Sequence, residues 1–375
     1  MRQRIDLVFP VLPPVIDGIG DHTACFSRAL SEQSDVRIWV SQGNYHPIAG
    51  VDVRPAYSLE RPSGIKSLLP SIEADPPDWL ILQFNQFSYG RWGFNPYVPL
   101  VVREMKRRIP SMRVAWVAHE DFVPVSSAKF AVMTTWQRWQ FWMLGRHADV
   151  VFFSIDPWVQ KYRAWFPRVP VEHLPIGSTM PRVAVDRRQA RRRLGLDEAT
   201  FVAGVFGTVN PSRMLPLIRE ASLALQERAP EFRLLYVGPH GKAMKDEMRG
   251  VHLLDAGILE PEDVSVHLAA MDVHLAPFID GVSTRRTSFM AGLQHGLPTV
   301  GTAGPLTDAV LHRRNGQAFL LAPVDDAAAF ERHAISLFED ASLRARIGSS
   351  ARSLYDSSFS FAASTRQFLK VIGEA

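Results

Sequence analysis

Residues 201–213 read FVAGVFGTVNPSR and carry the clearest sign of the architecture. The six residues 201–206 are apolar or small, which predicts a strand buried on both faces, as in a parallel sheet. Gly207 follows directly, and Arg213 stands six positions further on. A glycine just past a strand lets a phosphate oxygen approach the backbone, and a guanidinium can bind another oxygen bidentately. The stretch therefore predicts a parallel α/β sheet with an anion site at one strand end.

Nine further apolar runs are spread along both halves of the chain and are separated by longer helical stretches. They are Arg4–Phe9, Val36–Val40, Trp79–Gln83, Arg113–Ala118, Val150–Ser154, Phe232–Val237, Val251–Leu254, Val273–Ala276 and Pro298–Gly301. Strands that alternate with helices form parallel sheets, so we expect two successive doubly wound α/β domains with a boundary near Pro175–Pro181. Ligands of such sheets bind at the carboxyl ends of the strands, so the residues after each strand are the candidates for a site.

The composition agrees with this size and class. With 375 residues, of which 46% are hydrophobic, the chain is too long for one ordinary core and too apolar for wholesale disorder. The single cysteine, Cys25, excludes an internal disulfide framework and a multi-cysteine metal site. A net charge of +4 does not indicate nucleic acid. With no run of 18 apolar residues and no signal peptide, we expect a cytosolic protein without a spanning helix.

Residues 278–288, which read FIDGVSTRRTS, form the most informative loop. The loop leads through small hydroxyl residues into a helix that extends to Gln294. Arg285 and Arg286 stand at the start of this helix, where the helix dipole disfavours cations unless an anion is bound. A phosphate site is the favoured interpretation, and a solvated charged turn is the alternative.

In the first half, the loop after the first strand contains Gly18, Ile19, Gly20 and Asp21. Its glycines permit close approach of a ligand, and the following helix offers free N–H groups to an anion. The alternative is a plain helix entry with Asp21 as the capping residue.

The loops after the third and fourth strands carry polar side chains. Residues 83–90, QFNQFSYG, combine amides and aromatics that suit sugar hydroxyls, unless they only satisfy their own backbone. His119 and Glu120, followed by Asp121, stand where a histidine can orient a hydroxyl or share a proton.

Three other clusters are interpreted as structural. Trp136, Trp139, Phe141 and Trp142 favour core or interdomain packing over a membrane-facing helix, and the arginines at 187, 188, 191, 192 and 193 favour a solvated face. A second basic cluster could contact anionic lipid but more often only solvates a helix; it consists of Arg103, Lys106, Arg107 and Arg108.

Taken together, these residues resemble the GT-B glycosyltransferases, specifically the large retaining group that uses sugar nucleotides (glycosyltransferase family 4-like). The resemblance extends over most of the chain and rests on the order of its motifs. They are Gly18-Ile19-Gly20, His119, residues 173–177 (HLPIG), Gly207 with Arg213, residues 234–238 (LLYVG), 256–259 (AGIL), 271–273 (MDV) with Pro277, 295–300 (HGLPTV), and the region from Tyr355 to Phe359.

The resemblance implies two Rossmann-like domains that face a central cleft. Residues 1–178 would form the acceptor domain, residues 179–354 the nucleotide-sugar domain, and residues 355–375 a helix that crosses back to the first domain. By the same resemblance the catalytic residues are His119, Arg213 and Arg286. The donor-binding residues are Gly207, Thr208, Arg213, Gly257, Ile258, Leu259, Asp280, Ser283, Arg285, Arg286, Thr287 and Ser288. The acceptor-binding residues are Gly18, Ile19, Gly20, Asp21, Gln83, Asn85, Gln86, Tyr89 and Glu120.

The chain departs from the family pattern in two places. The family often has two glutamates eight positions apart near the 287–294 helix, and those positions hold Ser283 and Ala291 here. Its first phosphate-binding arginine corresponds to Thr208, and its lysine to Arg213. Arg285 and Arg286 would supply the charge lost at Thr208, and Asp280 would replace a sugar-binding acid.

The expected activity is metal-independent transfer of a hexosyl group, with retention, from a nucleotide diphosphate sugar to a glycan or lipid-linked acceptor in polysaccharide or glycoconjugate biosynthesis. No cofactor, metal or nucleic acid is expected, and a peripheral contact with the inner membrane face stays open. A GT-B sugar-nucleotide epimerase is one alternative, with Glu120 and Asp121 as its only candidate carboxylate pair. A non-catalytic sugar-nucleotide or glycan-binding protein is the other.

Overall fold

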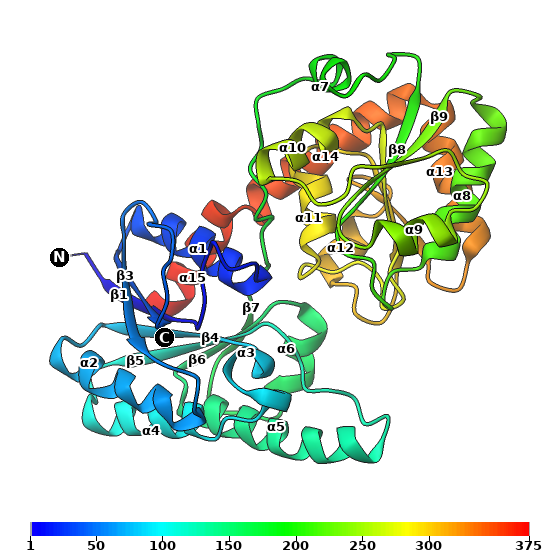
Figure 1. The fold of residues 1–375 in the computed structure, drawn as a ribbon. Helices are drawn as coiled ribbons and strands as arrows, with labels where there is room; N and C mark the ends of the chain where they lie inside the picture. Colours follow the sequence, from blue (N-terminus) through cyan, green and yellow to red (C-terminus); the bar gives the residue numbers. More distant parts are fainter. Residues whose placement is uncertain (1, 375) are drawn as a thin grey trace. The chain divides into compact units, whose positions relative to one another are not determined.

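The computed structural model describes residues 2–374, which divide into two compact units. The first unit contains the residues up to Pro175 together with the C-terminal segment from Phe361, and the second contains Ile176–Ser360. Each unit is built on one parallel sheet with connecting helices (Figure 1). The prediction of two parallel α/β domains is confirmed.

The first unit has a seven-stranded sheet in the order β3-β2-β1-β4-β5-β6-β7, and all neighbouring strands are parallel. Its strands are β1 Arg4–Val8, β2 Asp35–Ser41, β3 Val51–Tyr57, β4 Trp79–Phe84, β5 Arg113–Ala118, β6 Val150–Phe153 and β7 Val171–His173. Its helices are α1 Gly18–Ser31, η1 Pro62–Ser67, α2 Leu68–Ala74, α3 Gln86–Tyr89, η2 Arg91–Gly93, α4 Tyr97–Arg108, α5 Ala128–His147, α6 Asp156–Arg163 and α15 Phe361–Glu374.

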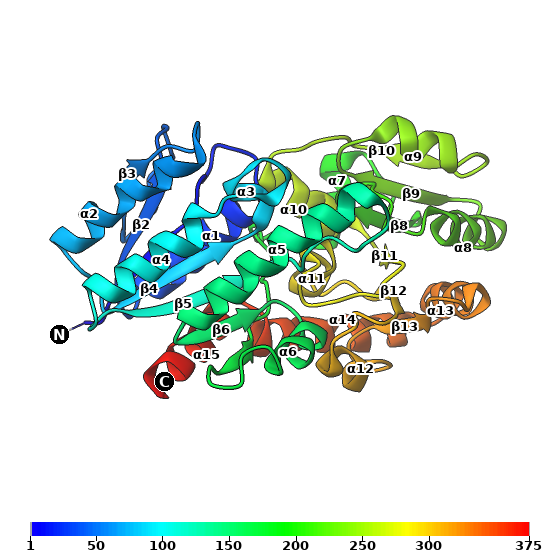
Figure 2. The same ribbon diagram turned by 90° about the horizontal axis from the view of Figure 1, so that it is seen from below.

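Helices cover both faces of this sheet, with α1 and α15 on one face and α2, α4 and α5 on the other (Figures 1 and 2). The C-terminal helix α15 is an integral part of the first core. Its Phe368 is fully buried and its ring lies 5.5 Å from that of Phe26 on α1 and 5.1 Å from that of Phe152 on β6. The last helix is therefore tied to the first unit by apolar packing.

The second unit has a six-stranded sheet in the order β10-β9-β8-β11-β12-β13, again with parallel neighbours throughout. Its strands are β8 Phe201–Phe206, β9 Phe232–Val237, β10 Leu253–Asp255, β11 Val273–Ala276, β12 Thr299–Ala303 and β13 Leu320–Pro323. Its helices are α7 Arg187–Leu194, α8 Leu215–Arg228, α9 Gly241–Glu247, α10 Pro261–Ala270, α11 Thr287–Gln294, α12 Ala309–Arg314, α13 Ala327–Glu339 and α14 Ala341–Ser358.

One of the arginines predicted to form a solvated face is buried instead. The side chain of Arg191 is completely enclosed, pairs with Asp272 at 2.5 Å, and donates to the carbonyls of Ala270 and Thr200. The number of arginines in this segment suggested a solvent-exposed helix face, but the guanidinium of Arg191 connects α7 to the sheet. Within residues 2–374, no helix is both long enough and apolar enough to cross a bilayer.

Candidate functional site

The strand order of each sheet reverses at one point, between β1 and β4 in the first unit and between β8 and β11 in the second. Loops that leave neighbouring strands in opposite directions open a crevice there, which is where open α/β sheets bind ligands. Gly207 follows β8 directly, and the loop that contains Asp280 follows β11. The two stretches predicted to bind phosphate thus lie on the same edge of the second sheet.

Gly207 has a backbone conformation and close neighbours that leave little room for a side chain. Its φ of +99° lies in the region that favours glycine. A Cβ atom at this position would lie 3.1 Å from Cβ of Ser288 and 3.4 Å from Nη2 of Arg213. The guanidinium of Arg213 and the first turn of α11 therefore both lie close to Gly207. We call Gly207, Arg213 and the 278–288 loop the phosphate cradle, after the role predicted for them.

Arg213 is a buried cation with no acidic partner. Only 5% of the residue is exposed, and it forms no ion pair with any acid in residues 2–374. Nη2 donates to the carbonyl of Phe206 at 2.8 Å and Nε to that of Thr208 at 3.3 Å, while Nη1 is buried without a partner. Burial, with a smaller contribution from Arg286, lowers the pKa of Arg213 to about 10. A buried charge without a counterion is costly, so the site is built for an anion.

Arg286 lies over the same aromatic ring as Arg213, that of Phe278. Its guanidinium carbon is 4.4 Å from the ring centre of Phe278, and that of Arg213 is 4.9 Å away. Nη1 of Arg286 donates to Oγ of Ser212 at 3.0 Å, and Nη2 lies 3.7 Å from Oδ2 of Asp280. The structure thus places two arginines of the predicted set beside one ring, with the carboxylate of Asp280 next to Arg286.

The rest of the 278–288 loop is held firmly by its neighbours. The amide of Val282 donates to Thr302 at 2.8 Å, and Gly281 has a φ of +83°. Ser283 is buried and its hydroxyl has no partner in the described chain, whereas Thr287 is exposed and Arg285 is half-buried. Arg286 caps α11 through its backbone only, so the first-turn amides near Ser288 carry no side-chain cap.

The loop predicted to hold the base lies next to this cradle. Gly257 has a φ of +68°, and its carbonyl accepts a hydrogen bond from the amide of Gly238 at 2.9 Å. Any Cβ on Gly238 would collide with the carbonyl of Gly207. Beside Gly257, Ile258 is 77% exposed and Leu259 is half-buried. An exposed isoleucine beside the phosphate cradle is the apolar contact that a flat heterocycle would use.

In the first unit, the helix that follows β1 is capped by Asp17, not by Asp21. Oδ1 of Asp17 accepts hydrogen bonds from the amides of Ile19 at 2.9 Å and Gly20 at 2.8 Å. Asp21 points into the first turn, where burial and the Asp17 carboxylate raise its pKa to about 6. Gly20 is required for packing, because a Cβ there would meet the carbonyl of Val11 at 2.8 Å, whereas Gly18 faces open space. The capping carboxylate therefore already occupies two of the amides predicted to contact a ligand.

His119 lies at the end of β5 and is part of a neutral cluster. Its Nε2 is 2.6 Å from Oε1 of Gln83, and its ring is edge-on to that of His22, with 5.1 Å between the centres. Burial, and then His22, lowers the pKa of His119 well below its ordinary value. Burial lowers the pKa of His22 to about 3, and neither of its ring nitrogens has a partner. His22 was not predicted as a site residue, because it belongs to no motif and is marked only by its place on the inner side of α1.

The amide and aromatic loop of residues 83–90 is used mainly for its own structure. Oδ1 of Asn85 caps α3 by accepting from the amide of Phe87 at 2.9 Å. The buried hydroxyl of Tyr89 donates to the carbonyls of Val8 at 3.1 Å and Gln83 at 2.8 Å. Gln86 is buried, and its side-chain amide has no partner. Only Gln83 of this group reaches the histidine cluster.

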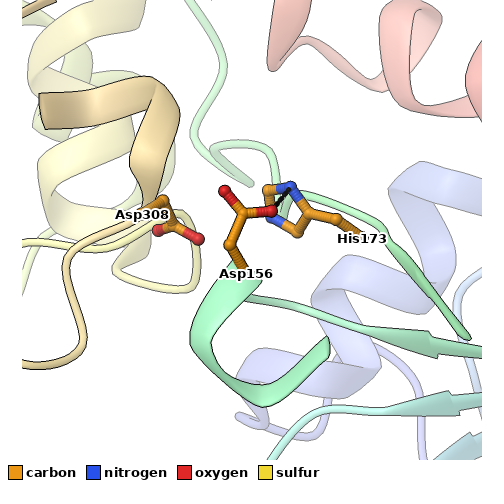
Figure 3. A group of neighbouring side chains, drawn as sticks. All are labelled: Asp156, His173 and Asp308. Atoms are coloured by element: carbon orange, nitrogen blue, oxygen red, sulfur yellow. Dashed lines mark ion pairs between the residues drawn. The ribbon is translucent and has the colours of Figure 1, made fainter. Parts of the chain in front are cut away.

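The acids after His119 are placed differently. Glu120 is half-buried, whereas Asp121 is engaged by Lys161 at 2.5 Å and by the hydroxyl of Tyr162. The motif at residues 173–177 also begins with an ordered side chain. Nδ1 of His173 forms an ion pair with Asp156 at 3.1 Å (Figure 3). Asp308, also drawn in Figure 3, belongs to the second unit, where it accepts from the amide of Thr284 at 2.7 Å.

The comparisons with known proteins agree with this geometry. Residues 200–340 match the family described as glycosyl transferases group 1. The matched segment contains Gly207, Arg213 and the whole 278–288 loop, which are the residues predicted to bind phosphate. No curated protein matches the sequence.

Solved structures align with the whole chain. A sucrose-phosphate synthase from Thermosynechococcus elongatus aligns over 100% of this chain and 99% of its own, with a TM-score of 0.70 and 14% identity. HepE of Anabaena in complex with UDP-glucose aligns over 99% and 100%, with a TM-score of 0.69 and 14% identity. The catalytic domain of starch synthase IV from Arabidopsis thaliana, bound to ADP and acarbose, aligns over 100% and 99%, with a TM-score of 0.68 and 14% identity. The fold is that of the GT-B glycosyltransferases.

Proposed function

We propose that the protein is a glycosyltransferase that binds a nucleotide diphosphate sugar on its second unit and transfers the sugar to an acceptor hydroxyl. The observation that carries the proposal is Arg213, a buried cation without an acidic partner in residues 2–374 whose guanidinium lies beside Gly207. The match of residues 200–340 to a glycosyltransferase family and the UDP-glucose complex of HepE support the same assignment.

Charge stabilisation is the chemistry that this site would supply. When the glycosidic bond to the donor phosphate breaks, negative charge develops on the leaving diphosphate. Nη1 of Arg213 and the guanidinium of Arg286 are held in place by hydrogen bonds to fixed groups, so they stabilise that charge without reorganising. The uncapped amides at the start of α11 add further donors.

We further propose that transfer proceeds with retention and without a divalent ion. Two arginines at the diphosphate supply the positive charge that a metal supplies elsewhere. The leaving phosphate can take the proton of the acceptor hydroxyl, so no side-chain base is needed. In the first unit, we assign contacts with sugar hydroxyls to His119, which stays neutral at physiological pH and therefore acts as a hydrogen-bonding group.

For the acceptor, we propose a glycan or lipid-linked sugar of polysaccharide or glycoconjugate biosynthesis, used in the cytoplasm. The single Cys25 fits a reducing compartment.

The test is a panel of UDP-, GDP- and ADP-sugars, assayed for release of the nucleotide diphosphate with and without candidate acceptors and with excess EDTA. Acceptor-dependent release that survives EDTA is the expected result. Arg286→Ala should weaken donor binding at least tenfold, whereas Arg219→Ala, a change at a half-buried arginine of α8 that is paired with Glu220, should not. Unchanged donor affinity in Arg286→Ala would show that the phosphate site has been placed wrongly.

A non-catalytic sugar-nucleotide-binding protein is the second candidate, and one observation favours it. The two positions where the family often has glutamates hold Ser283 and Ala291, and both are buried, so no acid reaches the sugar from there. Asp280, whose carboxylate is partly exposed beside Arg286, is the acid that would replace them in an active enzyme. Tight donor binding without turnover in the panel would select this second function. The epimerase alternative loses support, because Asp121 is engaged by Lys161 and Tyr162.

A further inference from the structure

Helix α5 of the first unit exposes aromatic side chains that its core does not use. Trp139 and Trp142 are 38% and 43% exposed, whereas Phe141 and Leu144 on the other side of the helix are buried. At 20 residues the helix is about 30 Å long, and it lies along one side of the unit (Figure 2). Trp139 and Trp142 were predicted to serve core or interdomain packing, but their exposure in the first unit leaves much of each indole uncovered by its own fold.

The loop around η2 extends this exposed surface. Nε1 of Trp136 donates to the carbonyl of Trp92 at 3.2 Å, and the rings of Trp136 and Phe94 lie 5.4 Å apart. Trp92 is itself 52% exposed and has a φ of +58°, a conformation that a bulky residue adopts only when its surroundings enforce it. The loop is thus bent so that a third indole lies at the surface. We call this surface the tryptophan face, which comprises Arg91, Trp92, Phe94, Lys129, Val132, Arg138, Trp139, Trp142 and Arg146.

The charges of the tryptophan face all have one sign. Residues 79–103 and 122–148 contain no aspartate or glutamate. The four cations of the face lie over aromatic rings, for example Arg146 over Trp142 at 5.3 Å and Arg91 over Trp92 at 5.0 Å. Within residues 2–374, none of these four cations forms an ion pair with an acid.

The neighbouring helix α4 shows the opposite arrangement. Its basic cluster was the predicted candidate for lipid contact, but its charges are largely neutralised. Arg107 and Arg108 both pair with Glu104 at 2.7 Å, and Lys106 pairs with Asp149 at 2.6 Å. Within residues 2–374, Arg103 is the member of this cluster that forms no ion pair, so the unpaired positive charge lies on Arg103 and on α5 and η2, where the exposed indoles also are.

We propose that the tryptophan face docks on an anionic lipid surface. Tryptophan prefers the boundary between headgroups and acyl chains, and a helix with indoles and cations on one side lies flat in that boundary. Arginines that form no ion pair are complementary to anionic headgroups, each contributing about 1 kcal/mol near a charged membrane. A single exposed helix side is not the basic groove that tracks a nucleic-acid backbone. The helix would bind in the plane of the surface, in agreement with the absence of a spanning helix in residues 2–374.

The test measures binding of the full chain to vesicles, without donor or acceptor, so it does not depend on the proposed enzymatic function. Vesicles of phosphatidylcholine alone are compared with vesicles that also contain 30 mol% phosphatidylglycerol, a fraction of about one third chosen to approximate a strongly anionic leaflet. We expect co-sedimentation only with the anionic vesicles, weakening as salt is raised, and quenching of tryptophan fluorescence by lipids brominated near the headgroup.

Variants locate the surface. Arg138→Ala with Arg146→Ala should lower the partition coefficient about tenfold or more, since two cations are lost. Trp139→Ala with Trp142→Ala should weaken binding and remove most of the brominated-lipid quenching. Arg107→Ala on α4 is the matched control and should bind as the wild type does. Each variant is checked for an unchanged circular dichroism spectrum and melting temperature.

Three outcomes would overturn the proposal. They are a lack of preference for anionic vesicles, full lipid binding in both double variants, and displacement of the protein from vesicles by an equimolar single-stranded RNA that binds more tightly. Saturable binding to an acidic protein from the same cells, with no binding to vesicles, would assign the face to a protein partner instead.

Discussion

The two points at which the sheets reverse their strand order differ sharply in charge. At the β8–β11 edge of the second unit, Arg213 and Arg286 are gathered around Phe278 with one carboxylate at the rim. At the β1–β4 edge of the first unit, the buried groups are His22 and Gln83, neutral residues beside His119. The same architecture thus has a cationic site in one unit and a neutral hydrogen-bonding site in the other.

This difference follows from what each kind of group can bind. Buried guanidiniums without counterions are expensive in the empty protein and become favourable only with an anion, so the second edge suits a diphosphate. Buried neutral imidazoles and amides neither attract nor repel charge, and they suit hydroxyl groups that both donate and accept hydrogen bonds. The proposed transfer from a sugar nucleotide would use both properties, one on each sheet.

The largest expected effect comes from removing the cation that defines the second edge. Arg213→Met should lower kcat/KM for any donor by about 10²- to 10³-fold, because a preorganised donor to the leaving phosphate is lost. The ligand-free protein should melt at the same temperature as the wild type or higher, since an uncompensated buried charge is replaced by an apolar chain. Calorimetric melting with and without nucleotide diphosphate measures both effects.

Arg191→Met is the matched control, because Arg191 is also buried but is paired with Asp272. This change should destabilise the fold by about 3 kcal/mol, because the buried carboxylate of Asp272 loses its buried cation and keeps only the more exposed Arg187, at 2.6 Å, as a counterion. If Arg213→Met instead lost stability like Arg191→Met and kept its nucleotide-induced rise in melting temperature, Arg213 would be structural and the comparison between the two edges would fail.

A smaller effect is expected at Gly207, which sets the approach to the phosphate. Gly207→Ala places a Cβ 3.1 Å from Ser288 and a non-glycine residue at φ +99°, so it should cost about 1–3 kcal/mol of stability and weaken nucleotide binding. Gly195→Ala provides the comparison: Gly195 also has a positive φ, +65°, but has open space around its Cβ position and ends α7. It should lose stability yet bind nucleotide normally. Equal loss of binding in both variants would mean that strain, and not contact with the ligand, explains the effect.

Much of the fold could be predicted because the central strands are continuous apolar runs. Arg113–Ala118, Phe201–Phe206, Phe232–Val237 and Val273–Ala276 match the observed strands to the residue. The three strands that were missed, β3, β7 and β13, are edge strands or short strands. β3 reads VDVRPAY, has one buried residue among its seven and contains Pro55, which is tolerated only at a sheet edge. Such a strand forms because a neighbour offers hydrogen bonds, and its own sequence does not reveal it.

The two edges were also unequally predictable. Gly207, Arg213 and Arg286 were identified because cations at strand ends and helix starts conflict with local rules unless an anion is present. Asp17 was overlooked as the cap of α1 in favour of Asp21, because both positions carry a preferred capping residue and only the backbone path decides between them. The burial of His22 likewise depends on how α1 packs against β5 and α15, which is tertiary information.

If the β1–β4 edge is neutral, His22 should make the stability of the protein depend on pH. The pKa of His22 is lowered to about 3 from its ordinary value near 6.5, so the unfolded chain binds a proton that the folded one does not in this interval. The stability that this group contributes is therefore present above pH 6.5 and is lost as the pH falls. Between pH 6.5 and 4.5, the free energy of unfolding of His22→Phe should therefore fall by about 2 kcal/mol less than that of the wild type, as measured by urea unfolding. His46→Gln, a change at an exposed histidine, should follow the wild type. An unchanged pH slope in His22→Phe would mean that His22 is not held neutral.

The smallest expected effect concerns the hydrogen bond that orients His119. With Oε1 of Gln83 at 2.6 Å, His119 carries its proton on Nε2, and Nδ1 is left as an acceptor for a sugar hydroxyl. Gln83→Leu removes this partner at similar volume and should lower kcat/KM about 3- to 10-fold, the value of one ordinary hydrogen bond, while Gln83→Asn recovers part of the loss only if its shorter amide still reaches the ring. The ¹⁵N chemical shifts of the His119 ring should report the Nε2–H tautomer in the wild type and a mixture in Gln83→Leu. A wild-type spectrum with the proton on Nδ1 would reverse the assignment. His119 would then donate to the sugar, and Gln83 would present its amide nitrogen to the ring.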